Sequence, residues 1–98
     1  MRISRNTFIT SNFIVEFAVG DTDYVATFKP VVDEDWYLGD RYDVRLFLSE
    51  YDNYDIGSIS VEIYEKIWDE ELKCYLFDSE RVINSELKNS INIIITKQ

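Results

Sequence analysis

The feature that most constrains the fold of this chain is an alternation of apolar and polar residues with a period of two. From Phe8 to Val19 most odd positions are apolar, while the even positions include Thr10, Asn12 and Glu16. A period of two places successive side chains on opposite faces of a β-strand. No segment carries a sustained apolar stripe with the period of an amphipathic helix. The alternation therefore predicts a fold built from strands, beginning with a long strand over 8–19.

Turn and edge signals divide the rest of the chain. Gly20–Asp23 is rich in residues that tolerate the backbone angles of turns. The chain then returns over 24–32, where Pro30 lacks an amide hydrogen and indicates a sheet edge or a strand end. Further strands are predicted at residues 42–48, 59–67, 73–77 and 92–96, the last of them filled with apolar residues on both faces. Predicted connections are an acidic and aromatic loop over 31–41, a second over 50–57, and a hairpin turn over 69–72.

The segment 78–90 is ambiguous. Ser79–Ile83 suits another strand, whereas Ser85–Asn89 suits a single helical turn. We predict one all-β domain over residues 1–98, an antiparallel β-sandwich or small barrel of about six or seven strands. It should contain at most one short helical turn, near residues 79–90.

The residues that most catalytic and metal sites require are scarce. The chain has no histidine, so the commonest general base and most zinc sites are excluded. Cys74 is the single cysteine and cannot form an intramolecular disulfide. We expect it to pack as a small apolar group beside Leu76. The three glycines stand singly, so there is no phosphate-binding loop. We expect a protein that is not an enzyme and has no cofactor or metal site.

Targeting signals are also missing from the sequence. Met1–Arg5 carries two bases, but no continuous apolar run and cleavage site follow it. No stretch reaches the ~18 apolar residues of a membrane span. We therefore expect a cytoplasmic protein of a bacterial host. Anionic headgroups would repel its acidic middle, which argues against membrane binding.

The negative charge is concentrated in the middle of the chain. Residues 21–55 hold ten acids against three bases, and residues 56–80 hold seven acids against two, within a formal net charge of −9. One role of an acidic surface is simply to keep a domain in solution, and this role needs no partner. However, crowded like charges repel one another and lower stability, so a basic partner that relieves the repulsion explains the clustering better.

The acidic segments also contain tyrosine and tryptophan, which anchor many protein interfaces. Carboxylates would steer a basic partner toward the surface, and aromatic rings would supply short-range contact. Three clusters form the predicted partner-binding site: Asp33, Glu34, Asp35, Trp36 and Tyr37; Glu50, Tyr51, Asp52, Tyr54 and Asp55; and Asp69, Glu70 and Glu71.

The charge also indicates the class of partner. Phosphates would be repelled, so direct binding of nucleic acid is not expected. A basic protein that itself binds DNA or RNA, such as a nuclease, is the expected partner. Strands space same-face carboxylates at roughly 6.5–7 Å, a row that a phosphate-binding channel could accept. By analogy with small acidic proteins of phages and mobile elements, we expect an inhibitor of an RNA-guided or restriction nuclease, acting by mimicry of DNA or by steric blocking.

Other functions stay open. Asp33–Asp35 and Asp52–Asp55 supply the oxygen ligands that calcium prefers. Aromatic residues in the same loops could stack on sugar rings, which would make the chain a calcium- or carbohydrate-binding sandwich module. Residues 91–95 could instead form an edge strand that pairs with a neighbouring subunit in a larger assembly. The oligomeric state does not follow from the sequence.

Overall fold

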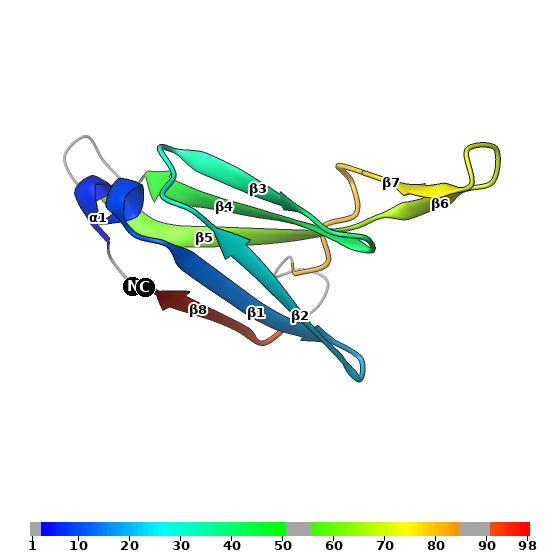
Figure 1. Ribbon diagram of the computed structural model, residues 1–98, viewed down its shortest axis with the longest axis horizontal. Helices are drawn as coiled ribbons and strands as arrows, with labels where there is room; N and C mark the ends of the chain where they lie inside the picture. Colours follow the sequence, from blue (N-terminus) through cyan, green and yellow to red (C-terminus); the bar gives the residue numbers. More distant parts are fainter. Residues whose placement is uncertain (1–2, 51–55, 85–90) are drawn as a thin grey trace.

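The computed structural model describes residues 3–50, 56–84 and 91–98, and for residues 49–50 and 56–58 it describes the backbone alone. The described chain is mainly β-structure, as predicted, with two three-stranded antiparallel sheets and one two-stranded hairpin (Figure 1). The elements in chain order are α1 (Arg5–Thr10), β1 (Phe13–Val19), β2 (Thr22–Phe28), β3 (Glu34–Leu38), β4 (Tyr42–Glu50), β5 (Ile56–Glu65), β6 (Ile67–Asp69), β7 (Cys74–Leu76) and β8 (Ile93–Lys97).

The first sheet has the order β2-β1-β8. Gly20 adopts φ +61° in the β1–β2 turn, a conformation that glycine reaches without strain. Val15, in the central strand, pairs with Ala26 of β2 and with Ile95 of β8. β2 ends at Phe28, just before Pro30, and is an edge strand, so the edge predicted from the proline is confirmed.

The second sheet has the order β3-β4-β5. Leu46 in the central strand β4 pairs with Asp35 of β3 and with Val61 of β5. Alternate residues of β4, including Val44 and Leu46, are fully buried on the face toward the first sheet. The opposite face, which we call the outer face, carries the intervening residues of the three strands.

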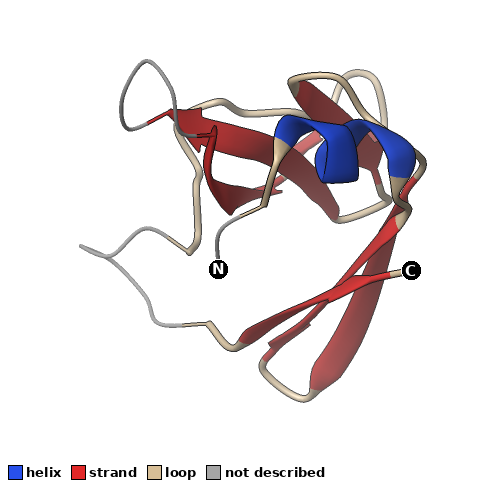
Figure 2. Cartoon of the chain, turned by 90° about the vertical axis from the view of Figure 1, so that its left-hand side faces the viewer, coloured by secondary structure: helices blue, strands red, loops and turns tan. Residues whose placement is uncertain are grey.

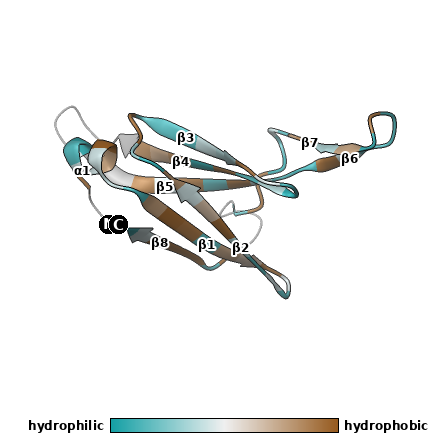
Figure 3. Cartoon of the chain, in the orientation of Figure 1, coloured by the Kyte–Doolittle hydropathy of each residue, from teal (hydrophilic) through white to brown (hydrophobic). Residues whose placement is uncertain are grey.

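The two sheets face each other across the core, and their strands show hydrophobic stretches in Figure 3. Phe13, Val15 and Phe17 of one sheet share a single buried cluster with Leu46 and Ile63 of the other. Helix α1 covers one end of the space between the sheets (Figure 2). Its Phe8 is fully buried, with its ring centroid 5.6 Å from that of Phe13. The core is therefore a sandwich interior closed at one end by the helix.

The described residues contain a short helix that the sequence did not predict, and the helical turn predicted at 85–89 lies outside them. The structure forms it at Arg5–Thr10, while residues 79–84 contain only a bridge between Val82 and Tyr64, and residues 85–90 lie outside the described part. Ser4 caps the helix by accepting a hydrogen bond from the Thr7 amide at 3.2 Å. The helical turn lets Phe8 enter the core while Ile9 is left exposed, the reverse of the predicted strand.

Three other predictions need correction. Residues 34–38, predicted as loop, form β3, because tyrosine and tryptophan suit a strand as well as aliphatic residues do. The predicted strand over 59–67 is broken at Lys66 into β5 and β6. The last strand, β8, is not filled on both faces: Ile93 and Ile95 pack on the core, but Ile94 is exposed. β8 is an edge strand of its sheet, and its pairing with another subunit stays a prediction.

Candidate functional site

The first predicted cluster, residues 33–37, lies along the edge strand β3, where alternation divides its side chains between two faces. Tyr37 faces inward, packs on the core and has its ring centroid 6.4 Å from that of Phe28. Asp33 pairs with Arg5 of the helix at 2.5 Å. Asp35 accepts a hydrogen bond from the Trp36 amide. The cluster is thus not a continuous exposed surface of acids and rings.

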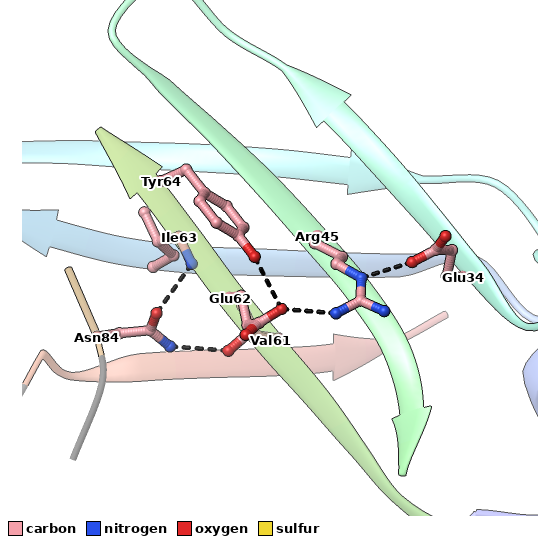
Figure 4. A network of polar contacts seen from close by, with 7 residues as sticks. All are labelled: Glu34, Arg45, Val61, Glu62, Ile63, Tyr64 and Asn84. Carbon is pink, nitrogen blue, oxygen red and sulfur yellow. Dashed lines mark hydrogen bonds and ion pairs between the residues drawn. The ribbon is translucent and has the colours of Figure 1, made fainter. Parts of the chain in front are cut away.

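Glu34, on the outer face, belongs to a network of ion pairs centred on Arg45 (Figure 4). The Arg45 guanidinium donates to Glu34 at 2.5 Å and to Glu62 at 2.6 Å, and it lies over the ring of Phe47. Glu62 also accepts a hydrogen bond from the Tyr64 hydroxyl at 3.0 Å. Burial disfavours the charged guanidinium, but the two carboxylates outweigh it and raise the pKa of Arg45. Arg45 therefore pairs with two acids within the protein, Glu34 of the predicted cluster and Glu62.

The edge of β5 beside this network is covered by residues 81–84. The Asn84 side chain accepts from the Ile63 amide at 2.8 Å and donates to the Val61 carbonyl at 2.7 Å (Figure 4). The Ile83 amide donates to the Ile63 carbonyl. Together they satisfy backbone groups that an open strand edge would leave exposed.

Two buried tyrosines predict a loss of stability at alkaline pH. Burial, followed by the effect of Glu62, raises the pKa of Tyr64; burial, followed by the effects of Tyr24 and Glu65, raises that of Tyr42. The folded state therefore keeps these protons to a higher pH than the unfolded state, where the pKa is about 10. Their contribution to stability is complete below about pH 10 and is lost as the pH rises through the folded pKa values.

This prediction is checked by urea unfolding between pH 8 and 11. The double variant with Tyr42→Phe and Tyr64→Phe should lose less stability over this range than the native protein. Absorbance titration at alkaline pH should lack the ionisation steps of the two replaced phenols. Equal losses in the two proteins would contradict the assignment.

The outer face carries a cluster of three rings that includes Tyr64, the β5 residue paired with Asp43. The ring of Trp36 lies 5.3 Å from that of Tyr64 and 5.4 Å from that of Phe77. Asp43 lies between Leu38 and Tyr64 in the sheet register and is only 1% exposed. Neither of its carboxylate oxygens has a hydrogen-bond partner among the described residues, and its charge is offset by the Lys66 ammonium 3.4 Å away. This buried pair joins β4 to the residue at which β5 gives way to β6.

The second predicted cluster lies almost wholly outside the described residues. Glu50 ends β4, but its side chain is not described. Tyr51, Asp52, Tyr54 and Asp55 fall within the gap 51–55. Their role in binding stays a prediction.

The third cluster lies at the tip of a hairpin that extends away from both sheets (Figure 1). We call residues 67–77, which include β6 and β7, the arm. Asp69 shapes its tip by accepting hydrogen bonds from the amides of Glu71 and Leu72 at 2.9 and 2.8 Å. Glu70 accepts from the Trp68 indole and pairs with Lys73, both at 3.0 Å. Glu71 is exposed, so the tip presents carboxylates to solvent.

The arm also exposes large apolar side chains. Trp68 is 43% exposed, Leu72 66% and Phe77 49%, and Ile67 and Leu76 are exposed as well. Figure 3 shows the hydrophobic colour of β6 at a distance from the core. Cys74 is exposed on β7, so the expected burial beside Leu76 is wrong: a two-stranded hairpin without a covering layer has no interior. The arm thus combines exposed acids with exposed apolar residues.

Contacts at the base of the arm link it to the body. The Arg41 guanidinium lies 4.5 Å from the centroid of the Tyr75 ring, a cation–π geometry. The Lys66 amide donates to the Arg41 carbonyl, and Phe77 belongs to the ring cluster with Trp36. These contacts orient the base of the hairpin, whereas its tip contacts neither sheet in Figure 1.

Other features bear on the alternative functions. Within residues 3–50, 56–84 and 91–98, no group of three or more acidic or cysteine side chains is arranged to hold a metal ion. The Asp52–Asp55 part of the calcium hypothesis lies outside those ranges. In the same described part, no helix has the length and apolar character needed to cross a membrane.

Sequence reasoning missed several residues of these sites: Arg45, Glu62, Phe77, Asn84 and the pair Asp43–Lys66. The alternation of polar and apolar residues places Arg45 and Glu62 on polar strand faces, so the sequence does contain a signal for the face on which each one lies. Their meeting depends on the register between β4 and β5, which places Arg45 opposite Glu62. No signal in the sequence sets this register or brings residue 84 against β5.

In comparisons with known proteins, no protein-family model, curated protein or solved structure matches the chain.

Proposed function

We propose that this protein is a non-enzymatic acidic binding protein that docks on a basic surface of a partner protein and blocks it. The observation that carries the proposal is the arm, which combines exposed Trp68, Leu72 and Phe77 with the carboxylates of Glu70 and Glu71. Exposed clusters of large apolar residues mark interaction sites. Tryptophan is among the residues that contribute most to binding energy at interfaces.

Charge supports a basic partner. The arm holds three acids and one base, and the whole chain carries a formal charge of −9. This field would accelerate encounter with a cationic surface and repel nucleic acid. The partner that we propose is a nucleic-acid-binding enzyme of a bacterial host, such as an RNA-guided or restriction nuclease. The protein would act as a phage or mobile-element inhibitor.

The arm is a better primary contact than residues 33–37. Asp33 and Glu34 already pair with Arg5 and Arg45, so a partner would have to replace ion pairs that exist in the free protein. In the arm, Glu70 pairs with Lys73, but both of these side chains are largely exposed, and Glu71 is an exposed acid that forms no ion pair with another described residue. We assign steering and anchoring to the arm, and a supporting role to β3.

The proposal is tested by cleavage assays with purified nucleases. An RNA-guided DNA endonuclease and a restriction endonuclease are each incubated with the protein before their DNA substrate is added. At least one should be inhibited. Trp68→Ala should weaken that inhibition about 30-fold, which corresponds to a loss of about 2 kcal/mol at a central interface residue. Glu70→Lys with Glu71→Lys should weaken it strongly at low salt and less at high salt.

A charge-matched control separates the arm from bulk charge. Asp21→Lys with Asp23→Lys makes the same change of charge at two exposed residues, one in the β1–β2 turn and one near the start of β2. It should retain most of the inhibition. Equal loss in both double variants would show that net charge, not the arm, carries binding. If neither nuclease is inhibited by the native protein, the proposed class of partner is wrong.

A further inference from the structure

A cavity of about 280 Å³ opens between the two sheets. Its lining includes Phe17, Tyr24, Tyr37, Asp40, Arg41 and Tyr42. We call it the tyrosine cavity. Pockets for drug-sized ligands begin at roughly 300 Å³, so this one suits a single side chain or a small molecule.

Aromatic rings form its walls. The rings of Tyr24 and Tyr42 meet edge to face with centroids 4.8 Å apart, and Phe17 stacks on Tyr24 at 5.3 Å. Tyr37 lines the cavity from β3. The face of an aromatic ring carries partial negative charge, and cations are attracted to several such faces placed together.

The β3–β4 turn brings the polar part of the lining into place. The Gly39 amide donates to the Tyr42 carbonyl at 3.1 Å. A Cβ atom at Gly39 would lie 2.6 Å from that carbonyl oxygen, so only glycine permits this tight turn. The turn places Tyr37, Asp40 and Tyr42 around one cavity.

The cavity is lined by one acid, Asp40, and one base, Arg41. Asp40 is exposed and forms no ion pair with another described residue. Arg41, the one base in the lining, has its guanidinium over the ring of Tyr75 in the arm. Tyr75 is not among the lining residues. Arg41 is thus engaged with the Tyr75 ring, whereas the Asp40 carboxylate has no ion-pair partner among the described residues, within a protein of net charge −9.

We infer that the tyrosine cavity binds the guanidinium group of an arginine side chain, held against its tyrosine rings and paired with Asp40. A planar guanidinium stacks on aromatic faces and is more weakly hydrated than an ammonium, so it loses less on entering a mainly aromatic cavity. The inference concerns a site separate from the arm and is testable without any partner protein.

The test is an NMR titration of the native protein with N-acetyl-arginine N-methylamide. Saturable shifts are expected at the amides of Tyr24, Tyr37, Gly39, Asp40 and Tyr42. The corresponding citrulline derivative, which keeps the shape but lacks the charge, should bind about tenfold more weakly, within the range of cation–π energies at partly desolvated sites. The lysine derivative should also bind more weakly than the arginine one.

Variants complete the test. Asp40→Asn should weaken binding of the arginine probe about fivefold, as expected for loss of a close opposite charge at a partly exposed site. Glu80→Gln removes an exposed carboxylate outside both the arm and the cavity lining, and it should leave binding of the probe unchanged. Equal binding of the arginine and citrulline probes, or shifts confined to other residues, would overturn the inference. Tighter binding of the lysine probe would overturn the choice of guanidinium.

The outcome is independent of the nuclease assays. A protein that inhibits a nuclease through the arm yet ignores the arginine probe would retain the proposed function and lose the cavity site. A protein that binds the probe and inhibits neither nuclease would retain the cavity site and lose the proposed function.

Discussion

Replacing Phe8 by alanine is expected to lower the free energy of unfolding by about 3–5 kcal/mol, the usual cost of deleting a buried phenylalanine. Phe8 is fully buried in the core cluster, with its ring against that of Phe13 at the end of the sandwich. Its removal leaves a void that the short helix cannot fill, because the Ser4 cap and the start of β1 hold both of its ends. Urea denaturation of the native and variant proteins measures the difference.

Ile9→Ala is the matched control. Ile9 is 37% exposed, so its truncation should cost less than about 1 kcal/mol. A strand over 8–19 would place Ile9 inside and Phe8 outside, and would reverse the order of the two effects. A larger loss for Ile9→Ala than for Phe8→Ala would therefore refute the helix at residues 5–10.

Lys66→Met is expected to lower the free energy of unfolding by about 3–5 kcal/mol at neutral pH, because it leaves a buried carboxylate without its counter-ion. Asp43 is 1% exposed and has no hydrogen-bond donor among the described residues, so the Lys66 ammonium is the group that offsets its charge there. Methionine keeps the apolar stem of lysine, which limits the loss of packing. Urea unfolding at pH 7 gives the value.

Two further variants identify the cause. Adding Asp43→Asn to Lys66→Met should recover part of the loss, because a buried neutral amide costs less than an unpaired charge. Lys73→Met breaks the exposed pair with Glu70 and should cost less than about 1 kcal/mol. A Lys66→Met protein as stable as the Lys73→Met protein would show that Asp43 is not held as a buried charge.

Several strands could be predicted from alternation alone. β1, β2, β4 and β8 lie within or near the segments predicted for them, because one-sided burial leaves a period of two in the sequence. β3 was not predicted, because the residues that alternate along it are acids and aromatic residues. The helix was not predicted, because six residues are too few to show a helical period in the sequence. Its formation also depends on burial of Phe8 in the core.

Only the composition of the candidate site could be predicted from the sequence. The sequence shows that acids and aromatic rings occur together at 33–37 and near 69–71. It does not show that Trp36 would pack under Phe77, or that Trp68 and Leu72 would stay exposed on the arm. Burial of a ring depends on what the rest of the chain places over it.

Residue types and their spacing are enough to show that this chain forms short antiparallel strands, that its charge is strongly negative, and that it has no histidine. These properties depend on residue type and on spacing between near neighbours. Only the tertiary structure decided which acids are neutralised, since Arg5 and Asp33, or Arg45 and Glu62, meet across strands and the helix. An ion pair depends on distance in space, which for residues far apart in the chain is set by register and packing.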